Sequence, residues 1–188
     1  MPALITPVGM LSFPNLFTPR AAMAGQDPMY SASILFDAKA QQSPEYLAMR
    51  KAVHEAGVKR WGADKMKDPA FTRNLRMPFR PAGEKAYAGY EEDMTYISAR
   101  TKDRPGVVDA RNQEMSVPDD VWPGQLCRLF LAPFAYEVSG NKGISFALNH
   151  VQITKQKMPR LDGRKAATDA FPMYEGPDGD DASDEMPF

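Results

Sequence analysis

QLCRLFLAPFAYEV, residues 125–138, decides the fold class, because its side chains alternate between two faces of different chemistry. One face is aliphatic and carries Cys127, Leu129 and Leu131. The other mixes aromatic rings with a cation: Arg128, Phe130, Phe134 and Tyr136. Alternation with a period of two is typical of a strand that lays one face on a core. The turn SGNKG at 139–143 leads into GISFALNHVQIT at 143–154, so we expect a β-hairpin.

Three further stretches predict strands: residues 4–13, 30–36 and 94–101. In the last of them, alternation places Tyr96, Ser98 and Arg100 on one face and an aliphatic pair on the other. The chain has 13 Gly and 17 Pro, a content that favours short strands joined by turns. We therefore expect a mainly β fold with five strands.

One helix is predicted between the early strands. Ser43 is a good N-cap, Pro44 suits the first helical position, and Gly62 is a plausible end. Apolar residues recur between them at helical spacing: Tyr46, Met49, Val53 and Ala56. Residues 63–93 are expected to be irregular because prolines interrupt them, and residues after 158 are rich in Asp, Gly, Pro and Ser. We expect a domain at 1–158 and a flexible acidic tail at 159–188.

The net charge of −1 hides a segregation of the two signs along the chain. Residues 175–188 carry six carboxylates and no Lys or Arg, whereas the other 174 residues have a net charge of +5. Such asymmetry indicates either a nucleic-acid partner or a solubilising terminus, and charge alone does not choose between them.

Enzyme chemistry finds little support in the sequence. Phosphate-binding, hydrolase and zinc-protease motifs are absent, and Cys127 with His54 and His150 is too small a set for a structural zinc site. The carboxylates of Asp119-Asp120 and Glu91-Glu92-Asp93 could hold a divalent metal, but adjacent residues of one loop rarely converge on an ion. We expect no catalytic residue, no metal and no cofactor.

No apolar run approaches the roughly 18 residues of a membrane span, and the first residues lack the pattern of a signal peptide. We expect a soluble intracellular protein without a membrane partner.

Cations beside aromatic rings are the most informative pattern for function. Single-stranded nucleic acid needs cations along its phosphates and flat rings on which unpaired bases stack. The two strands that mix rings with Arg, the turns beside them and the loop at 73–80 predict a binding groove: Tyr96, Arg100, Lys102, Arg104, Arg128, Phe130, Phe134, Tyr136, Lys142, Arg76, Phe79 and Arg80. The alternative is that the rings are core or dimer contacts.

The segment Asp184-Glu185-Met186-Pro187-Phe188 is the most specific local feature. An acidic peptide that ends in Phe offers a ring for a pocket and a carboxylate for an Arg at its rim. It resembles the acidic Pro-Phe tip with which bacterial single-stranded DNA-binding proteins recruit replication and repair enzymes.

A longer series of motifs covers most of the chain. They are VGMLSFPNLF at 8–17, YSASILF at 30–36, KRWG at 59–62, YAGY at 87–90, YISA at 96–99, RPGVVD at 104–109, WPG at 122–124 and GNKGIS at 140–145. In this series the chain resembles a family of phage single-stranded DNA-binding proteins, long filed as a domain of unknown function, with an oligonucleotide/oligosaccharide-binding (OB) fold. The loop at 80–85, RPAGEK, departs from the more acidic turn of that family.

The resemblance implies a five-stranded OB barrel and sequence-tolerant binding of single-stranded DNA. We therefore expect a protein that coats and protects single-stranded DNA during replication or recombination, in the cytoplasm of an infected bacterial host. We expect a homo-oligomer whose acidic tail recruits replication or recombination proteins and competes with DNA. Two alternatives stay open: a structural or adaptor protein of the virion, and a metal-dependent nuclease.

Overall fold

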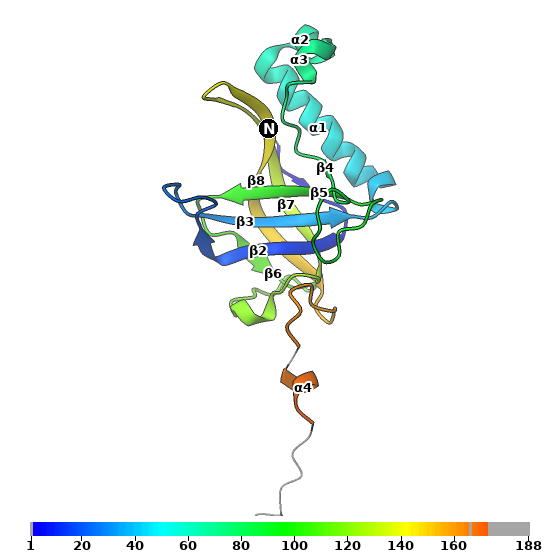
Figure 1. Cartoon of the computed structure of the whole chain (residues 1–188), viewed down its shortest axis with the longest axis vertical. Coiled ribbons are helices and arrows are strands. Elements are labelled where there is room, and N and C mark those ends of the chain that lie inside the picture. The colour runs from blue at the N-terminus through cyan, green and yellow to red at the C-terminus, as the bar shows by residue number, and fades with distance from the viewer. Residues whose placement is uncertain (1, 166, 173–188) are drawn as a thin grey trace, which may run out of the picture.

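The computed structural model describes residues 2–165 and 167–172 of the chain (Figure 1). Its strands are β1 (Leu4–Ile5), β2 (Gly9–Arg20), β3 (Met29–Phe36), β4 (Arg80–Pro81), β5 (Thr95–Thr101), β6 (Gly106–Val108), β7 (Leu126–Val138) and β8 (Asn141–Lys155). Its helices are η1 (Ala40–Gln42), α1 (Pro44–Trp61), α2 (Ala63–Lys67), α3 (Pro69–Thr72), η2 (Pro118–Asp120) and α4 (Ala167–Ala170). The mainly β fold predicted from the sequence is thus confirmed.

Five strands pair in a closed cycle, β2-β3-β5-β8-β7 and back to β2. Every pairing in the cycle is antiparallel except β5 with β8, which run parallel. The two shortest junctions join β2 to β7 and β5 to β8. Each of these five strands overlaps one of the five predicted stretches, and β1, β4 and β6 add short edge pairings.

The predicted first strand, 4–13, is divided between β1 and β2, and β2 continues past Pro14 to Arg20. A proline can lie in a strand where the ladder is already interrupted. The pairing of β2 with β3 shifts register between Ser12 and Asn15, and Phe13 there has a φ of 45°. This bulge accommodates Pro14 and bends β2 around the barrel.

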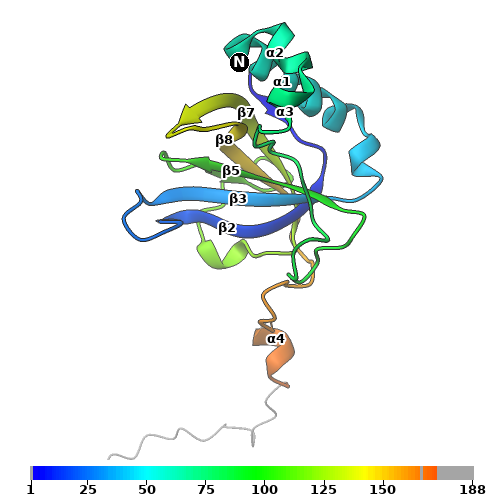
Figure 2. The same cartoon turned by 45° about the horizontal axis from the view of Figure 1, so that its top comes forward.

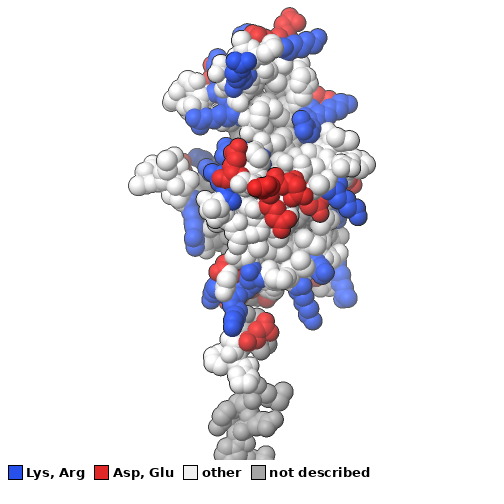
Figure 3. All heavy atoms as spheres, turned by 45° about the vertical axis from the view of Figure 1, so that its right-hand side comes forward, with Lys and Arg blue, Asp and Glu red and all other residues white. Residues whose placement is uncertain are grey.

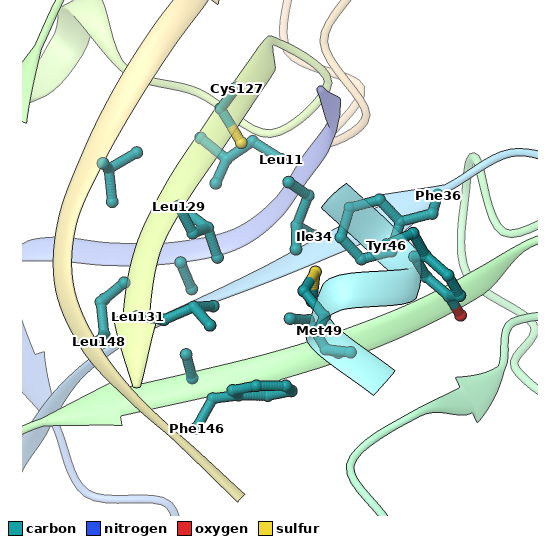
Figure 4. Packing of buried hydrophobic residues seen from close by; sticks show 14 of the residues in the cluster. Leu11, Ile34, Phe36, Tyr46, Met49, Cys127, Leu129, Leu131, Phe146 and Leu148 are labelled. Atoms are coloured by element: carbon teal, nitrogen blue, oxygen red, sulfur yellow. The ribbon is translucent and has the colours of Figure 1, made fainter. Parts of the chain in front are cut away.

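The core lies between the inner faces of the strands and one face of α1. Ser43 caps that helix as predicted, since its side chain accepts a hydrogen bond from the Tyr46 amide at 3.2 Å. Figure 4 shows the aliphatic face of β7 packed toward β2, β3 and the first turns of α1. The predicted inner residues are all buried: Tyr46, Met49, Val53, Ala56, Cys127, Leu129 and Leu131.

The expectation of an irregular stretch at 63–93 is wrong in part, because α2, α3 and β4 lie within it. Asp68 caps α3 by accepting from the Ala70 amide at 2.9 Å, and Pro69 occupies the first helical position. A proline that interrupts the helical period therefore begins a new short helix here.

The chain after β8 stays in contact with the barrel beyond the expected boundary at 158. Trp122 Nε1 donates to the Met158 carbonyl at 3.1 Å, and the Leu161 amide donates to the Pro123 carbonyl at 2.9 Å. The Arg160 guanidinium lies 5.4 Å from the centre of the Trp122 ring. The acidic tip, 184–188, lies outside the described residues.

No helix in residues 2–165 or 167–172 combines the length and the apolar character that crossing a membrane requires.

Candidate nucleic-acid interface

The outer face of β2, β3 and β5 is the first candidate surface, and we call it the front face. Figure 1 shows these three strands side by side across the molecule, with β7 and β8 running behind them. β3 and β5 are the second and third strands of the barrel cycle. In OB folds this face and the loops beside it bind oligonucleotides and oligosaccharides.

The floor of the front face is polar. The hydroxyls of Ser33 on β3 and Ser98 on β5 are hydrogen-bonded at 2.7 Å, and Asn15 Nδ2 donates to Ser31 Oγ at 3.1 Å. Arg100 pairs in register with Ser31, and its side chain is exposed. Between the floor and the β2–β3 loop lies a hollow of about 270 Å³, lined among others by Asn15, Arg20, Gln26, Asp27, Ser31 and Arg100.

Lys102 pairs with Asp27, one of the residues that line this hollow. Its Nζ lies 2.9 Å from Asp27 Oδ2, so the β2–β3 loop is joined to the end of β5 by an exposed ion pair. Both side chains are more than 70% exposed, and a pair of this kind contributes at most about 1 kcal/mol. A phosphate could therefore displace Asp27 from Lys102 at little cost.

Three aromatic rings stand at the other end of the front face. Phe13 and Tyr87 meet edge to face with centres 5.1 Å apart, and Tyr90 lies 5.4 Å from Tyr87. Phe13 and Tyr87 are each about half exposed, whereas Tyr90 is held by a hydrogen bond to Ser12 at 3.2 Å. Burial raises the pKa of Tyr90, and the hydrogen bond to Ser12 opposes that rise. Together these rings form a partly open aromatic cluster.

Phe13 is held in a strained backbone conformation. Its φ of 45° lies in the left-handed region, which is rare for a bulky side chain and costs roughly 1–2 kcal/mol. The bulge in β2 turns its ring outward against Tyr87. Strain of this kind is concentrated at functional sites.

The structure separates the residues of the predicted groove. Arg100 and Lys102 lie on the front face, and Arg80 pairs with Tyr96 where β4 meets β5. The outward-facing residues of β7 lie behind, on the other side of the barrel: Arg128, Phe130, Phe134 and Tyr136. The structure therefore does not place all of these side chains in one groove.

Two predicted aromatic residues are covered. Tyr96 points to the outer side of β5 as the alternation requires, but it is only 7% exposed because the loop at 82–94 lies over it. With Leu35 and Ala82 it forms a second small core. Phe79 packs against Tyr46 and the core residue Phe146, with ring centres 5.3 and 6.0 Å away. Tyr96 is thus buried and Phe79 partly buried, which limits the ring surface open to bases. Alternation alone cannot show what covers a face.

The β7–β8 outer face carries the remaining predicted rings. Phe130 lies parallel to His150 at 6.0 Å, and His150 Nδ1 accepts a hydrogen bond from the Gly106 amide at 3.1 Å. Phe134 is 45% exposed and lies 6.4 Å from Tyr136. Arg128 Nε donates to Gln152 Oε1 at 3.1 Å. This face mixes rings and polar groups as predicted, but its Arg128 is already engaged within the protein.

The remaining predicted cations lie in turns. The Arg104 guanidinium lies 5.7 Å from the centre of the Phe17 ring. Arg76 is exposed, and its backbone bonds to both sides of Gly143, with its amide donating to the Lys142 carbonyl and its carbonyl accepting from the Ile144 amide. Lys142 lies near the tip of the β7–β8 hairpin.

No group of three or more His, Cys, Asp or Glu side chains that could hold a metal ion occurs within residues 2–165 and 167–172. Cys127 is fully buried, and burial raises the pKa of its thiol. It is a core residue, because a thiol without access to solvent or to a base is a poor nucleophile.

Comparison with known proteins decides the family. The family described as Enterobacter phage Enc34, ssDNA-binding protein, matches residues 3–185. The chain belongs to this family of phage single-stranded DNA-binding proteins. None of the curated proteins matches the chain.

Solved structures show the same fold. The single-stranded DNA-binding protein from bacteriophage Enc34 in complex with ssDNA is similar with a TM-score of 0.68 and 19% identity, over 82% of this chain and 87% of that chain. The structure of gp2.5, a single-stranded DNA-binding protein encoded by bacteriophage T7, is similar with a TM-score of 0.61 and 12% identity, over 88% of this chain and 98% of that one.

The aromatic cluster is a candidate site that the sequence reasoning does not predict. Its signal was present in the motif Tyr87-Ala-Gly-Tyr90, in which two rings flank a glycine. Gly89 has a φ of 79°, a conformation that favours glycine, and this turn brings the rings of Tyr87 and Tyr90 together. Phe13 belongs to the same cluster through a contact that is distant in sequence.

Proposed function

We propose that this protein binds single-stranded DNA on the front face, without strong preference for sequence. The observation that carries the proposal is that a partly open aromatic cluster and a cationic hollow lie on the same face, the one with which OB folds bind their ligands. Bases stack on Phe13 and Tyr87, and phosphates lie along Arg20, Arg100 and Lys102. Stacking needs no fixed base, because every base has an aromatic face.

The chemistry of this face favours single strands over duplex. Rings can stack only on bases that are unpaired, and the polar floor of Ser31, Ser33 and Ser98 offers small groups that accept any base edge. The bend of β2 at Phe13 and the loop at 82–94 border the face at its aromatic end.

We propose further that the protein coats single-stranded DNA during replication or recombination in the cytoplasm of an infected bacterial host, without turnover, and that it self-associates there. The β7–β8 outer face is a second proposed contact, for the strand or for another copy. The acidic tail, 175–188, competes for the cations when DNA is absent and recruits replication or recombination proteins when the front face is filled. Family membership supports the binding function, and the charge of the tail supports the competition.

A fluorescence titration with labelled oligo-dT at two salt concentrations tests the proposal. If four to six phosphates are neutralised, log K falls with log salt at a slope of roughly −3 to −4. An affinity that does not depend on salt contradicts the binding mode, and no binding at all favours a structural protein of the virion.

Two additional arms complete the experiment. Deletion of 175–188 should raise the affinity most at low salt, and an unchanged affinity there contradicts competition but not recruitment. Incubation of the labelled oligonucleotide with magnesium identifies a nuclease by loss of full-length strand. Light scattering with and without DNA measures self-association.

A further inference from the structure

The positive charge of the chain is concentrated away from the barrel. We define the helical cap as residues 58–76, the last turn of α1 with α2, α3 and the segment that follows. It carries six Lys or Arg against Asp64 and Asp68, a net charge of +4, whereas residues 1–174 together have +5. All six cations are exposed: Lys59, Arg60, Lys65, Lys67, Arg73 and Arg76. Figure 3 shows Lys and Arg side chains at this end of the molecule as well as along its sides and at its lower end, and a group of carboxylates in the middle of the view.

The cap also presents rings and a hollow beside its cations. Trp61 and Phe71 meet edge to face at 5.6 Å, and Lys142 Nζ from the β7–β8 hairpin lies 5.8 Å from the centre of the Phe71 ring. Between α3 and the hairpin lies a hollow of about 410 Å³, whose lining includes Phe71, Asn74 and Lys142. The lining also includes the carboxylate of Asp68, so the hollow itself offers one cation and one ring, and the other exposed cations of the cap lie around it. Cations and rings together are the components that single-stranded nucleic acid requires.

Three donors of this region converge on one carboxylate. Glu137 near the hairpin tip lies 3.2 Å from Lys142 Nζ and 3.9 Å from Arg60 Nη2, and Trp61 Nε1 donates to it at 3.4 Å. The hydrogen bonds from Lys142 and Trp61 lower the pKa of Glu137. Donors from α1 and from β8 thus form a seat for an anion, and Glu137 occupies it.

The segment at 76–81 connects the cap to the front face. Arg80 pairs with Tyr96 on β5, and Arg76 bonds to both sides of Gly143 on β8. Both arginine side chains are exposed, so cations continue from β5 to the hairpin and the cap. A DNA strand that left the front face across the loop at 83–93 would instead pass four exposed carboxylates: Glu84, Glu91, Glu92 and Asp93.

We propose that the helical cap is a second anchor for single-stranded DNA, which binds the phosphates of the strand after it leaves the front face along Arg80 and Arg76. Glu137 fills the anion seat until a phosphate displaces it. The inference rests on the proposed function, because it assumes that the front face binds the first part of the strand. It predicts that cap cations matter only for a strand long enough to reach them.

Oligonucleotides of two lengths separate the anchor from the front face. A single OB fold covers roughly 4–16 nucleotides, so oligo-dT of about 6 and of about 30 nucleotides serve as the short and long probes. The double variant Lys67→Gln with Arg73→Gln removes two exposed cap cations. The control, Lys155→Gln with Lys157→Gln, removes the same charge at the opposite end of the molecule, where the chain leaves β8 (Figure 2).

The cap variant should bind the short probe as the unmodified protein does and bind the long probe about tenfold more weakly at low salt. Its salt slope for the long probe should fall by roughly 1.4, which is about 0.7 for each lost phosphate contact. The control variant should leave both affinities within about twofold. The proposal of a second anchor is overturned if the cap variant loses affinity equally for both probes, or if its loss of affinity is no larger than that of the control variant. Failure of the proposed function looks different, because then the unmodified protein binds neither probe.

Glu137→Gln tests the anion seat. The variant should bind the long probe several-fold more tightly and the short probe unchanged, since Lys142, Arg60 and Trp61 are then available to a phosphate. A long-probe affinity equal to that of the unmodified protein, with thermal unfolding showing that the variant is folded, overturns the displacement of Glu137.

Discussion

The front face and the β7–β8 outer face carry the same types of residue but differ in what those residues contact. On the front face, the rings of Phe13 and Tyr87 are half exposed, one of them on a strained backbone, and the same face carries a hollow lined by cations. On the β7–β8 face, Phe130 lies on His150 and Arg128 bonds to Gln152. Period-two alternation predicts both faces equally well. The partners that each side chain finds in three dimensions distinguish the two faces, and they are the reason why we propose the front face as the primary DNA-binding surface.

Tyr96→Ala tests the claim that the front face has a core of its own beneath the loop at 82–94. Tyr96 is 7% exposed and packs with Leu35 and Ala82, so we expect a loss of about 3 kcal/mol in the free energy of unfolding. Denaturant unfolding measures it. A loss below about 1 kcal/mol would mean that the loop does not cover Tyr96 tightly and that its ring is accessible to DNA, as strand alternation predicts.

Two substitutions of Phe13 separate strain from stacking. Both Phe13→Ala and Phe13→Gly remove the ring, so each should weaken oligo-dT binding by about 1–3 kcal/mol. Only glycine relieves the positive φ, so the Gly variant should be more stable than the Ala variant by about 1 kcal/mol. Titration and denaturant unfolding of the two variants provide the comparison. A Gly variant that is the less stable of the two contradicts the strain.

Arg100→Gln and Arg128→Gln compare one arginine from each face. Arg100 is exposed beside the hollow, so its loss should lower the salt slope of binding by roughly 0.7 and weaken binding a few-fold. Arg128 is held by Gln152, and its loss should leave the slope unchanged. Titrations across a salt series measure both. The assignment of faces is reversed if Arg128→Gln has the larger effect on the slope.

The smallest expected effect is a dependence of folding stability on pH that is caused by Glu137. Its pKa is lowered in the folded protein, so the stabilisation from its partners is present above the ordinary pKa of a glutamate and is lost as the pH falls through the lowered value. The unmodified protein should therefore exceed Glu137→Gln slightly in melting temperature at pH 7, and the difference should shrink at acid pH. A difference that is constant with pH would show that the carboxylate does not titrate with its partners.

Much of the fold was accessible from the sequence because it depends on local pattern. Alternation in 125–138, the hairpin that follows it and the cap at Ser43 each depend on neighbouring residues, and the structure confirms all three. The turn of that hairpin is tighter than predicted, because Asn141, Lys142 and Gly143 already pair in β8. The short helix α3 was missed because Pro69 was interpreted as an interruption of the helical period and not as the first residue of a new helix.

The site depends on contacts between residues that are distant in sequence. Phe13 on β2 contacts Tyr87 from a distant part of the sequence, and the loop at 82–94 covers Tyr96. Neither contact can be predicted from the periodicity of residues within one strand. The position of Arg128 opposite Gln152 likewise follows from the register of β7 with β8 and not from the composition of either strand.

The most direct test of the central claim compares one exposed ring from each face in the same titration. Tyr87→Ala and Phe130→Ala are measured against oligo-dT of about 6 nucleotides at fixed salt, with unfolding curves to confirm that both variants are folded. Binding on the front face predicts a loss of about 1–3 kcal/mol for Tyr87→Ala and little change for Phe130→Ala. A larger loss for Phe130→Ala would contradict the account and move the primary DNA-binding surface to β7 and β8.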